Sequence, residues 1–373
     1  MTAPKAPLSA IPADIRSLAD YERYAAQHFP AASWTHLQEG SGDHLTLIEN
    51  RDAFDRIGLV PRVLTDLRQA TTQSDLFGRS HASPILLAPI AYQRIAHPEG
   101  ELAMVRAATA MDVGMILSTL SSVTLEDVAA ARQSAVQELG ASPSPLWFQL
   151  YWQEDRAHVL QLVQRAEAAG YEAIMLTVDA SIKRSSFPLP EGVDAANLRG
   201  MPRLQQTAQP RGRILFGTPL LDAAPRWDDL AWLRAQTKLP LIIKGVMSPA
   251  DACLAIDHGA DGIVISNHGG RVLDTMPSAL DMLPGIAQVV DGKVPLLIDG
   301  GIRRGTDVLK ALALGASAVL VGRPQMHALA VAGMAGVAHA LLMLRTELEL
   351  AMAQTGCASL ADIGPDRLFM RAI

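Results

Sequence analysis

The chain of 373 residues is poor in cysteine and contains only Cys253 and Cys357. Neither belongs to a paired spacing of the kind that binds zinc, and both fall in segments with a helical pattern, so we interpret them as core thiols. The histidine, aspartate and glutamate residues form no cluster with metal-site spacing either. The sequence therefore predicts no bound metal.

An excess of basic residues and a long apolar run are also missing. Lysine and arginine number 32 against 38 aspartate and glutamate, a formal net charge of −6, so no broad positive field attracts nucleic acid. No apolar run is long enough to cross a bilayer, which predicts no integral membrane segment. The N-terminal segment has Lys5 but no continuous apolar stretch, so we expect no secretory signal and a cytoplasmic location.

Core-forming residues, in contrast, are plentiful: 49% of the chain is hydrophobic and 19% is charged, which is typical of a folded protein. From Pro84 onward, short apolar runs alternate with amphipathic stretches of about ten to seventeen residues, the rhythm of repeated βα units. We count eight runs: Ile85–Ala88, Met115–Leu117, Leu146–Leu150, Ala173–Val178, Leu241–Lys244, Gly262–Ile265, Leu296–Ile298 and Ala318–Val321. Eight parallel strands close a barrel, so we predict an α/β fold, the (β/α)8 or TIM barrel.

The same rhythm divides the chain into segments. Residues 1–76 contain helical pieces joined by polar turns and are predicted to form an N-terminal helical cap, and residues 77–373 form the barrel. Residues 180–226 interrupt the repeat after the fourth strand, and six prolines exclude a long helix there. We predict an insertion that acts as an active-site lid.

The insertion also carries a group of arginines without an intervening acid, Arg199, Arg203, Arg211 and Arg213. Such a group is compatible with a lid over an anionic ligand or with a membrane-facing patch. Charge runs are more often simply solvated, and we favour that interpretation, a loop exposed to water.

One stretch concentrates reactive groups. Residues Ser266–Asp274, with the sequence SNHGGRVLD, directly follow the sixth apolar run, and barrel enzymes hold their chemistry at the carboxyl ends of their strands. His268 offers a proton acceptor near neutral pH, and Arg271 offers a forked cation for a carboxylate or phosphate. The two glycines between them let the backbone approach a ligand closely. We therefore predict the active site here.

The seventh and eighth runs end in segments rich in glycine and arginine. Gly300 and Gly301 leave backbone N–H groups accessible, and Arg303 and Arg323 add charged donors. Barrels often bind phosphate after these two strands, so a phosphate site is predicted.

Lys244 ends the fifth run, LIIK, which points its ammonium group into the barrel mouth. A buried cation is unfavourable without a partner. The partner is either a carboxylate, such as Asp179 or Asp299, or an anion that forms during a reaction.

Together these motifs resemble a known family. The segments APIAYQRIAHPEGE, WFQLYW, LTVD, LIIKGV, SNHGGRVLD, LIDGGIRRGTDVLKALALGA and VGRP look like those of the FMN-dependent 2-hydroxy-acid oxidases and dehydrogenases, which include glycolate, lactate and mandelate oxidases. The likeness runs from about Glu49 to the C-terminus and touches every strand. It implies bound FMN, oxidation of an L-2-hydroxy acid to the 2-keto acid, and a homo-oligomer, commonly a tetramer.

The resemblance also assigns roles. It makes His268 the catalytic base, Asp179 the carboxylate that orients it, Tyr151 the phenol on the substrate oxygen, Arg271 the clamp on the substrate carboxylate, and Lys244 the cation that stabilises negative charge on the reduced ring. Removal of the hydroxyl proton with hydride transfer and removal of the α-proton both remain open. The implied FMN contacts are Pro89, Ile90, Ala91, Ser118, Gln149, Thr177, Lys244, Ser266, Asp299, Gly301, Arg303, Gly322 and Arg323.

Three substrate-facing positions depart from the family pattern. Leu37 stands where we align a carboxylate-binding tyrosine, Leu120 where glycolate oxidase has tryptophan, and Ser186 where an arginine is usual. Tyr92 and Arg184 are the candidates to compensate. These departures predict a substrate larger or more apolar than glycolate.

The electron acceptor follows from one further position. Ala91 resembles the oxidases rather than the glycine of mandelate dehydrogenase, which favours O2 as the acceptor and H2O2 as the product. The alternatives are a dehydrogenase with another acceptor, an isomerase that uses the flavin without net oxidation, and an FMN-binding barrel without efficient turnover.

Overall fold

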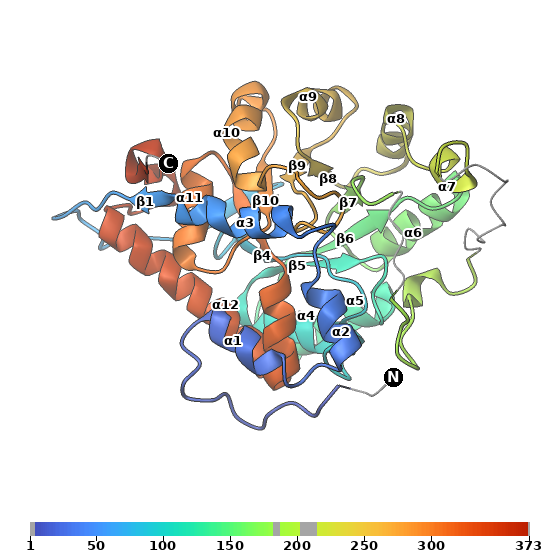
Figure 1. The fold of residues 1–373 in the computed structure, drawn as a ribbon, viewed down its shortest axis with the longest axis horizontal. Coiled ribbons are helices and arrows are strands. Elements are labelled where there is room, and N and C mark those ends of the chain that lie inside the picture. The colour runs from blue at the N-terminus through green and yellow to red at the C-terminus, as the bar shows by residue number, and fades with distance from the viewer. Residues whose placement is uncertain (1–3, 182–186, 202–214, 372–373) are drawn as a thin grey trace.

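The computed structural model describes residues 4–181, 187–201 and 215–371 and contains a closed barrel of eight parallel strands (Figure 1). Each strand pairs with its neighbours in sequence, and β11 pairs with β4 to close the barrel. The strands are β4 (Ile85–Leu87), β5 (Gly114–Ser118), β6 (Leu146–Tyr151), β7 (Ile174–Thr177), β8 (Leu241–Val246), β9 (Gly262–Ile265), β10 (Leu296–Asp299) and β11 (Ala318–Val321). These are the eight predicted runs, so the predicted (β/α)8 fold is confirmed.

Alternation along the strands separates the inside of the barrel from its outer face. The inward-facing residues of the lower layers are apolar and pack together, among them Leu86, Ile116, Trp147, Ile242 and Leu297. Because side chains alternate with a period of two, the next inward position along each of several strands lies one layer higher, at the carboxyl end. These positions are polar and buried: Ser118, Gln149, Thr177, Lys244, Ser266 and Asp299. The sequence thus builds an apolar floor with a polar mouth above it.

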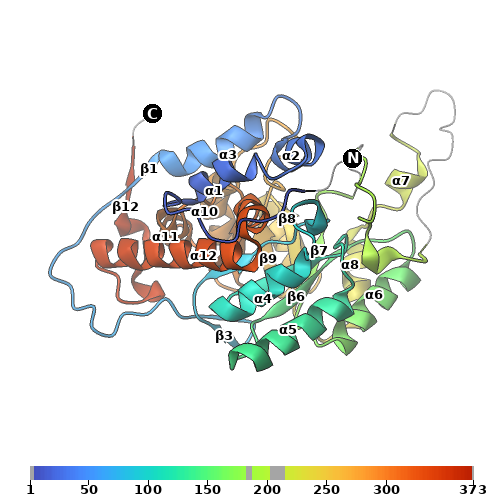
Figure 2. The same ribbon diagram turned by 90° about the horizontal axis from the view of Figure 1, so that it is seen from below.

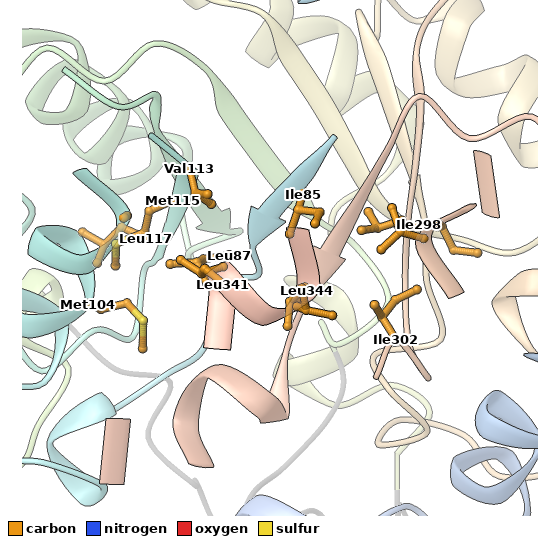
Figure 3. Close-up of a cluster of buried hydrophobic side chains, with 14 of the residues drawn as sticks. Ile85, Leu87, Met104, Val113, Met115, Leu117, Ile298, Ile302, Leu341 and Leu344 are labelled. Atoms are coloured by element: carbon orange, nitrogen blue, oxygen red, sulfur yellow. The ribbon is translucent and has the colours of Figure 1, made fainter. Parts of the chain in front are cut away.

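Helices surround the barrel and bury the outward strand faces. The outer core contains strand residues such as Leu87 and Leu117 together with Met104 of α4 and Leu341 of α12 (Figure 3). In Figure 2, α12, α4, α5 and α6 follow one another around the molecule. The helices are α4 (Glu101–Met111), α5 (Leu125–Leu139), α6 (Arg156–Ala168), α8 (Trp227–Gln236), α9 (Pro249–Asp257), α10 (Ala279–Val290), α11 (Gly305–Ala313) and α12 (Arg323–Thr355).

Helix α12 qualifies the prediction that no segment could cross a bilayer. With 33 residues it is long and apolar enough by length and composition. It nevertheless packs against α1, α4 and α11, and 61% of its most apolar stretch is buried in the protein. Non-helical backbone at Ala332 and Gly333 also divides it. These features are those of a core helix. The sequence did not indicate it, because polar residues interrupt its apolar stretch.

The N-terminal segment contributes helices α1 (Leu18–Ala25), α2 (Ala31–Gln38) and α3 (Leu45–Asp55). It also contains short strands that the helical expectation left out. Strand β1 (Ile57–Leu59) pairs with β12 (Leu368–Met370) near the other end of the chain, and β2 (Ser74–Leu76) forms a hairpin with β3 (Arg79–His81). Such short strands depend on their pairing partners and on packing, which the local sequence pattern does not indicate.

The hairpin turn closes the lower end of the barrel. Its turn residues Phe77 and Gly78 both have positive φ angles, 51° and 76°, as a tight two-residue hairpin turn requires. The Phe77 ring lies 5.4 Å from that of Trp147 inside the barrel. The opposite end of the barrel is the one with polar side chains.

The insertion between β7 and α8 is anchored to the barrel by Asn197, whose side chain is buried. Its Nδ2 donates to Ser121 Oγ at 2.8 Å, and its Oδ1 accepts from the Leu125 backbone N–H at 2.8 Å. Arg199 forms an exposed ion pair with Asp194, as expected of a solvated arginine. Arg203, Arg211 and Arg213 lie outside the described residues.

Candidate active site

A cavity of about 480 Å³ opens at the carboxyl ends of the strands. Most of the predicted site residues line it: Leu37, Pro89, Ile90, Ala91, Tyr92, Ser118, Leu120, Tyr151, Thr177, Lys244, His268, Arg271, Asp299, Gly301, Arg303, Gly322 and Arg323. Three others, Gln149, Asp179 and Ser266, stand directly behind the lining and hydrogen-bond to it. Arg184 and Ser186 lie outside the described residues.

His268 and Asp179 form a hydrogen-bonded pair across the mouth. His268 Nδ1 lies 2.9 Å from Asp179 Oδ1, and the other ring nitrogen, Nε2, lies 3.4 Å from the Tyr151 hydroxyl. The His268 backbone has a φ angle of 58°, which is uncommon for a residue with a side chain. Ser266 Oγ accepts from the His268 backbone N–H at 3.0 Å and supports this turn. Strained backbone held in this way is typical of functional sites.

Burial and charge tune these groups for proton transfer. Burial lowers the pKa of His268, and Asp179 opposes this effect only in part. The imidazole is therefore uncharged at neutral pH and can accept a proton. Burial alone would raise the pKa of Asp179, but at the acid pH where this carboxyl group titrates His268 is protonated, and its charge and that of Lys244 outweigh burial and lower the pKa overall. Burial and then Asp179 raise the pKa of Tyr151, which keeps its phenol protonated. The site therefore holds an acceptor beside a donor.

The position of Asp179 depends on the absence of a side chain at Gly245. A β-bulge interrupts the pairing of β8 with β9 between Lys244 and Val246, and Gly245 within it has a φ angle of 106°. A Cβ atom at this position would stand 2.6 Å from Asp179 Cβ. Only glycine allows this close approach.

Lys244 belongs to a buried network with Ser266 and Asp299. Its Nζ donates to Ser266 Oγ at 2.8 Å and lies 3.2 Å from Asp299 Oδ2, while Ser266 Oγ donates to Asp299 Oδ1 at 2.6 Å. Burial would lower the pKa of Lys244, but Asp299 and Asp179 raise it overall. The carboxylate partner that the sequence left open is therefore Asp299, and the ammonium group stays charged beneath the cavity.

Three partly buried guanidinium groups, those of Arg271, Arg303 and Arg323, line the cavity. Arg323 donates to the backbone oxygens of Leu37 and Gly269 at 2.9 and 3.0 Å, and Arg271 donates to that of Glu39 at 2.9 Å. Burial, together with the charges of Arg271 and Arg303, lowers the pKa of Arg323 to about 9. An anion between these groups would relieve their mutual repulsion.

Helix α3 holds the glycine loop after β10. Arg51 Nη1 donates to the Gly301 backbone oxygen at 2.8 Å, and the same guanidinium binds both carboxylate oxygens of Asp307. Gly301, with a φ angle of 79°, packs so closely on the Asn50 backbone that a Cβ atom would overlap it. The loop thus presents bare backbone to the cavity.

The donors and acceptors fit a flavin mononucleotide. Gln149 Nε2 and Thr177 Oγ1 are buried at the strand ends and have no hydrogen-bond partner among the described residues. A polar ring edge would satisfy them, and a phosphate would meet Arg303, Arg323 and the glycine backbone. The family model for FMN-dependent dehydrogenases matches residues 25–370.

The chain belongs to the FMN-dependent dehydrogenase family. Its relatives include the L-lactate oxidase of Alicycliphilus denitrificans, 48% identical, with 97% of this chain and 98% of the relative covered. The 4-hydroxymandelate oxidase of Amycolatopsis orientalis is 46% identical over 92% of this chain and 95% of its own length. Glycolate oxidase 3 of Arabidopsis thaliana is 41% identical, with 94% and 95% covered. The chain is thus an FMN-dependent oxidoreductase related to the 2-hydroxy-acid oxidases.

Solved structures agree. Mandelate oxidase with (S)-2-phenylpropionate superposes with a TM-score of 0.83 at 44% identity, covering 96% of this chain and 99% of that one. Mandelate oxidase with benzoyl-formic acid gives 0.83 at 43%. The predicted family and the predicted FMN cofactor are confirmed.

Some residues that line the cavity of this family member were not predicted. They are His36, Glu39, Ile95, Trp152, Ala180, Ser181 and Ile302, and they come from the cap, the loops and the start of the insertion. Leu37 lines the cavity as predicted, and its backbone oxygen also accepts hydrogen bonds from Arg271 and Arg323, which the sequence did not indicate. A contact made by a backbone oxygen does not depend on the side chain, so the residue type does not predict it.

Replacing Asp179 by asparagine should change the pH profile of kcat/KM. As the predicted base, His268 accepts a proton only when neutral, and its lowered pKa places the expected acid limb below pH 6.5, the usual value for histidine. Because Asp179 raises that pKa, its removal should move the acid limb to lower pH and lower the plateau on the order of 10²-fold. Asp66→Asn, which removes an exposed partner of Arg68, is the control and should change neither. A limb that moves to higher pH would contradict this account.

Proposed function

We propose that this protein oxidises an L-2-hydroxy acid to the 2-keto acid and reduces O2 to H2O2. The observation that carries the proposal is the His268–Asp179 pair, with His268 Nε2 beside the Tyr151 hydroxyl and Arg271 on the same cavity. FMN, when bound, supplies the chemistry of accepting two electrons from the substrate.

The chain's own residues bind and deprotonate the substrate. Arg271 holds its carboxylate, and the Tyr151 hydroxyl donates to its 2-oxygen. His268 Nε2 takes the proton, and Asp179 accepts from Nδ1–H and stabilises the imidazolium that results. Lys244 holds a positive charge beneath the reacting centre.

The remaining lining residues would hold FMN in two groups. The strand-end side chains Ser118, Gln149, Thr177, Lys244 and Ser266, with the backbone from Pro89 to Ala91, would surround the ring and ribityl chain. The phosphate and ribityl hydroxyls would meet the groups after β10 and β11: Asp299, Gly301, Arg303, Gly322 and Arg323. The second group is supported by Arg303 and Arg323, which line the same cavity and whose pKa values are lowered by burial and by neighbouring arginines, so that an anion beside them would be favourable.

Oxygen as the acceptor is supported by Ala91 and by the relatives, which are named as oxidases. The test is to incubate the air-saturated holoenzyme with L-lactate, (S)-mandelate and glycolate and to measure keto acid and H2O2 together. One H2O2 per keto acid supports an oxidase. Keto acid formed only with an artificial dye would indicate a dehydrogenase, and no reduction by any hydroxy acid would indicate a binding protein.

Substrate size is set by an apolar wall that includes Ile90, Leu120 and Trp152. We expect kcat/KM to be higher for branched or aromatic 2-hydroxy acids than for glycolate, by about 10- to 200-fold per well-packed carbon. Leu120→Trp fills this wall and should remove most of that preference while keeping glycolate turnover. Leu139→Trp, at an exposed position on α5, is the matched control. A wild-type enzyme that prefers glycolate would refute the size argument.

A further inference from the structure

We infer that His36 is a second binding group for the substrate carboxylate, opposite Arg271, and that the Glu39 carboxylate competes for the same two groups. The inference rests on the proposed function and adds a residue that the family resemblance did not supply. It starts from one oxygen atom. Glu39 Oε1 lies 3.4 Å from His36 Nδ1 and 3.8 Å from Arg271 Nη2.

This geometry shows that one carboxylate can reach both groups at once. His36, Glu39 and Arg271 all line the cavity that holds His268 and Tyr151. A carboxylate between an imidazole and a guanidinium is favoured by charge-assisted hydrogen bonds. Glu39 therefore acts as an internal stand-in for the carboxylate of a 2-hydroxy acid.

The end of α2 fixes His36 relative to Arg271. Arg271 Nη1 donates to the backbone oxygens of Leu37 and Glu39 at 3.2 and 2.9 Å. Arg323 donates to the same two oxygens at 2.9 and 3.1 Å. These bonds satisfy carbonyl groups at the helix end, which otherwise lack partners. The last turn of α2 is thus docked onto both arginines.

A ring contact orients the His36 imidazole. Phe187 of the insertion stacks on the imidazole. The two ring centroids lie 4.2 Å apart, and the angle between the ring planes is 7°. The stack fixes the plane of the ring, and Nδ1 on its edge lies 3.4 Å from Glu39 Oε1. Cap and insertion therefore meet at the residue that we assign to the substrate.

Exposure distinguishes the competitor from the binding groups. The Glu39 side chain is 46% exposed, whereas those of His36 and Arg271 are 19% and 18% exposed. Glu39 can rotate into water with little loss, because an exposed ion pair contributes little. The two less exposed groups, His36 and Arg271, stay in place, so a substrate carboxylate can take over both contacts.

The test compares ligands with and without a carboxylate in the FMN-loaded enzyme. The probes are pyruvate and 2-oxo-2-phenylacetate, each against its amide, and binding is measured from the change in flavin absorbance. His36→Phe keeps the stack on Phe187 but removes both ring nitrogens. We expect it to weaken both carboxylates about 10-fold or more and to leave the amides unchanged within about 2-fold.

The variant Glu39→Gln is expected to have the opposite effect on carboxylate binding. Removing the competing charge should tighten the carboxylates about 3-fold or more, and the gain should disappear in the double variant with His36→Phe. Equal weakening of acids and amides by His36→Phe, or unchanged or weaker acid binding in Glu39→Gln, would overturn the inference. If His36→Phe does not fold, Glu39→Gln decides alone. Binding needs no turnover, so an enzyme that binds keto acids this way but oxidises no hydroxy acid refutes only the proposed function.

Discussion

His268→Ala should lower kcat by about 10²- to 10⁴-fold while the protein keeps its yellow colour. The imidazole is the proton acceptor that faces the Tyr151 hydroxyl, and its removal leaves no comparable base at that point of the cavity among the described residues. Flavin retention is expected because most groups assigned to FMN lie on other strand ends, and because alanine keeps the backbone N–H that donates to Ser266 Oγ on this strand end. Stopped-flow reduction of the flavin by an excess of substrate measures the loss directly.

His258→Ala is the matched control for this variant. His258 lies at the end of α9, where its Nδ1 contacts the Leu254 backbone oxygen at 2.8 Å, far in the fold from the strand ends. Its loss should leave reduction unchanged. A colourless His268→Ala protein would instead make His268 a structural residue, and unchanged reduction would remove it from the mechanism.

Lys244→Met should destabilise the protein by about 3–5 kcal/mol, because it leaves buried carboxylates without their cation. The Lys244 and Asp299 side chains are only 5% and 10% exposed, and Ser266 links them. Methionine fills most of the space, so the effect reports charge rather than a cavity. Chemical denaturation of the variant and wild type at the same FMN concentration measures the difference.

A second substitution separates charge from packing in this network. Lys244→Met combined with Asp299→Asn removes both charges and should recover much of the lost stability. Flavin reduction should not recover, since the positive charge beneath the reacting centre is still missing. A double variant as unstable as the single one would show that packing, and not charge, explains the loss.

The barrel and the cofactor half of the site were predictable because both depend on local patterns. Apolar runs at regular spacing mark eight strands, and the last inward residue of a strand, such as Thr177 or Lys244, is in the mouth whatever the loops do. Gly301 and Arg303 follow their strand within a few residues, so their position also depends on short-range geometry.

The substrate half was harder because its residues come from segments that meet only in the folded protein. His36 and Glu39 reach the cavity on a helix more than 200 residues from Arg271 in sequence, and no periodicity connects them. Asn50 likewise exchanges two amide hydrogen bonds of 2.9 Å with Asn267 across the chain. Contacts of this kind depend on how whole elements pack.

By itself, then, the sequence determined the barrel and the flavin cofactor and predicted the base, since each depends on the strands and on residues that follow them closely in the sequence. The tertiary structure decided which carboxylate partners Lys244, that the Leu37 backbone rather than its side chain binds the arginines, and that His36 faces Arg271 across Glu39. The physical reason is that residues of the cap and of the start of the insertion line this site, and docking onto the barrel, not local sequence, places their side chains.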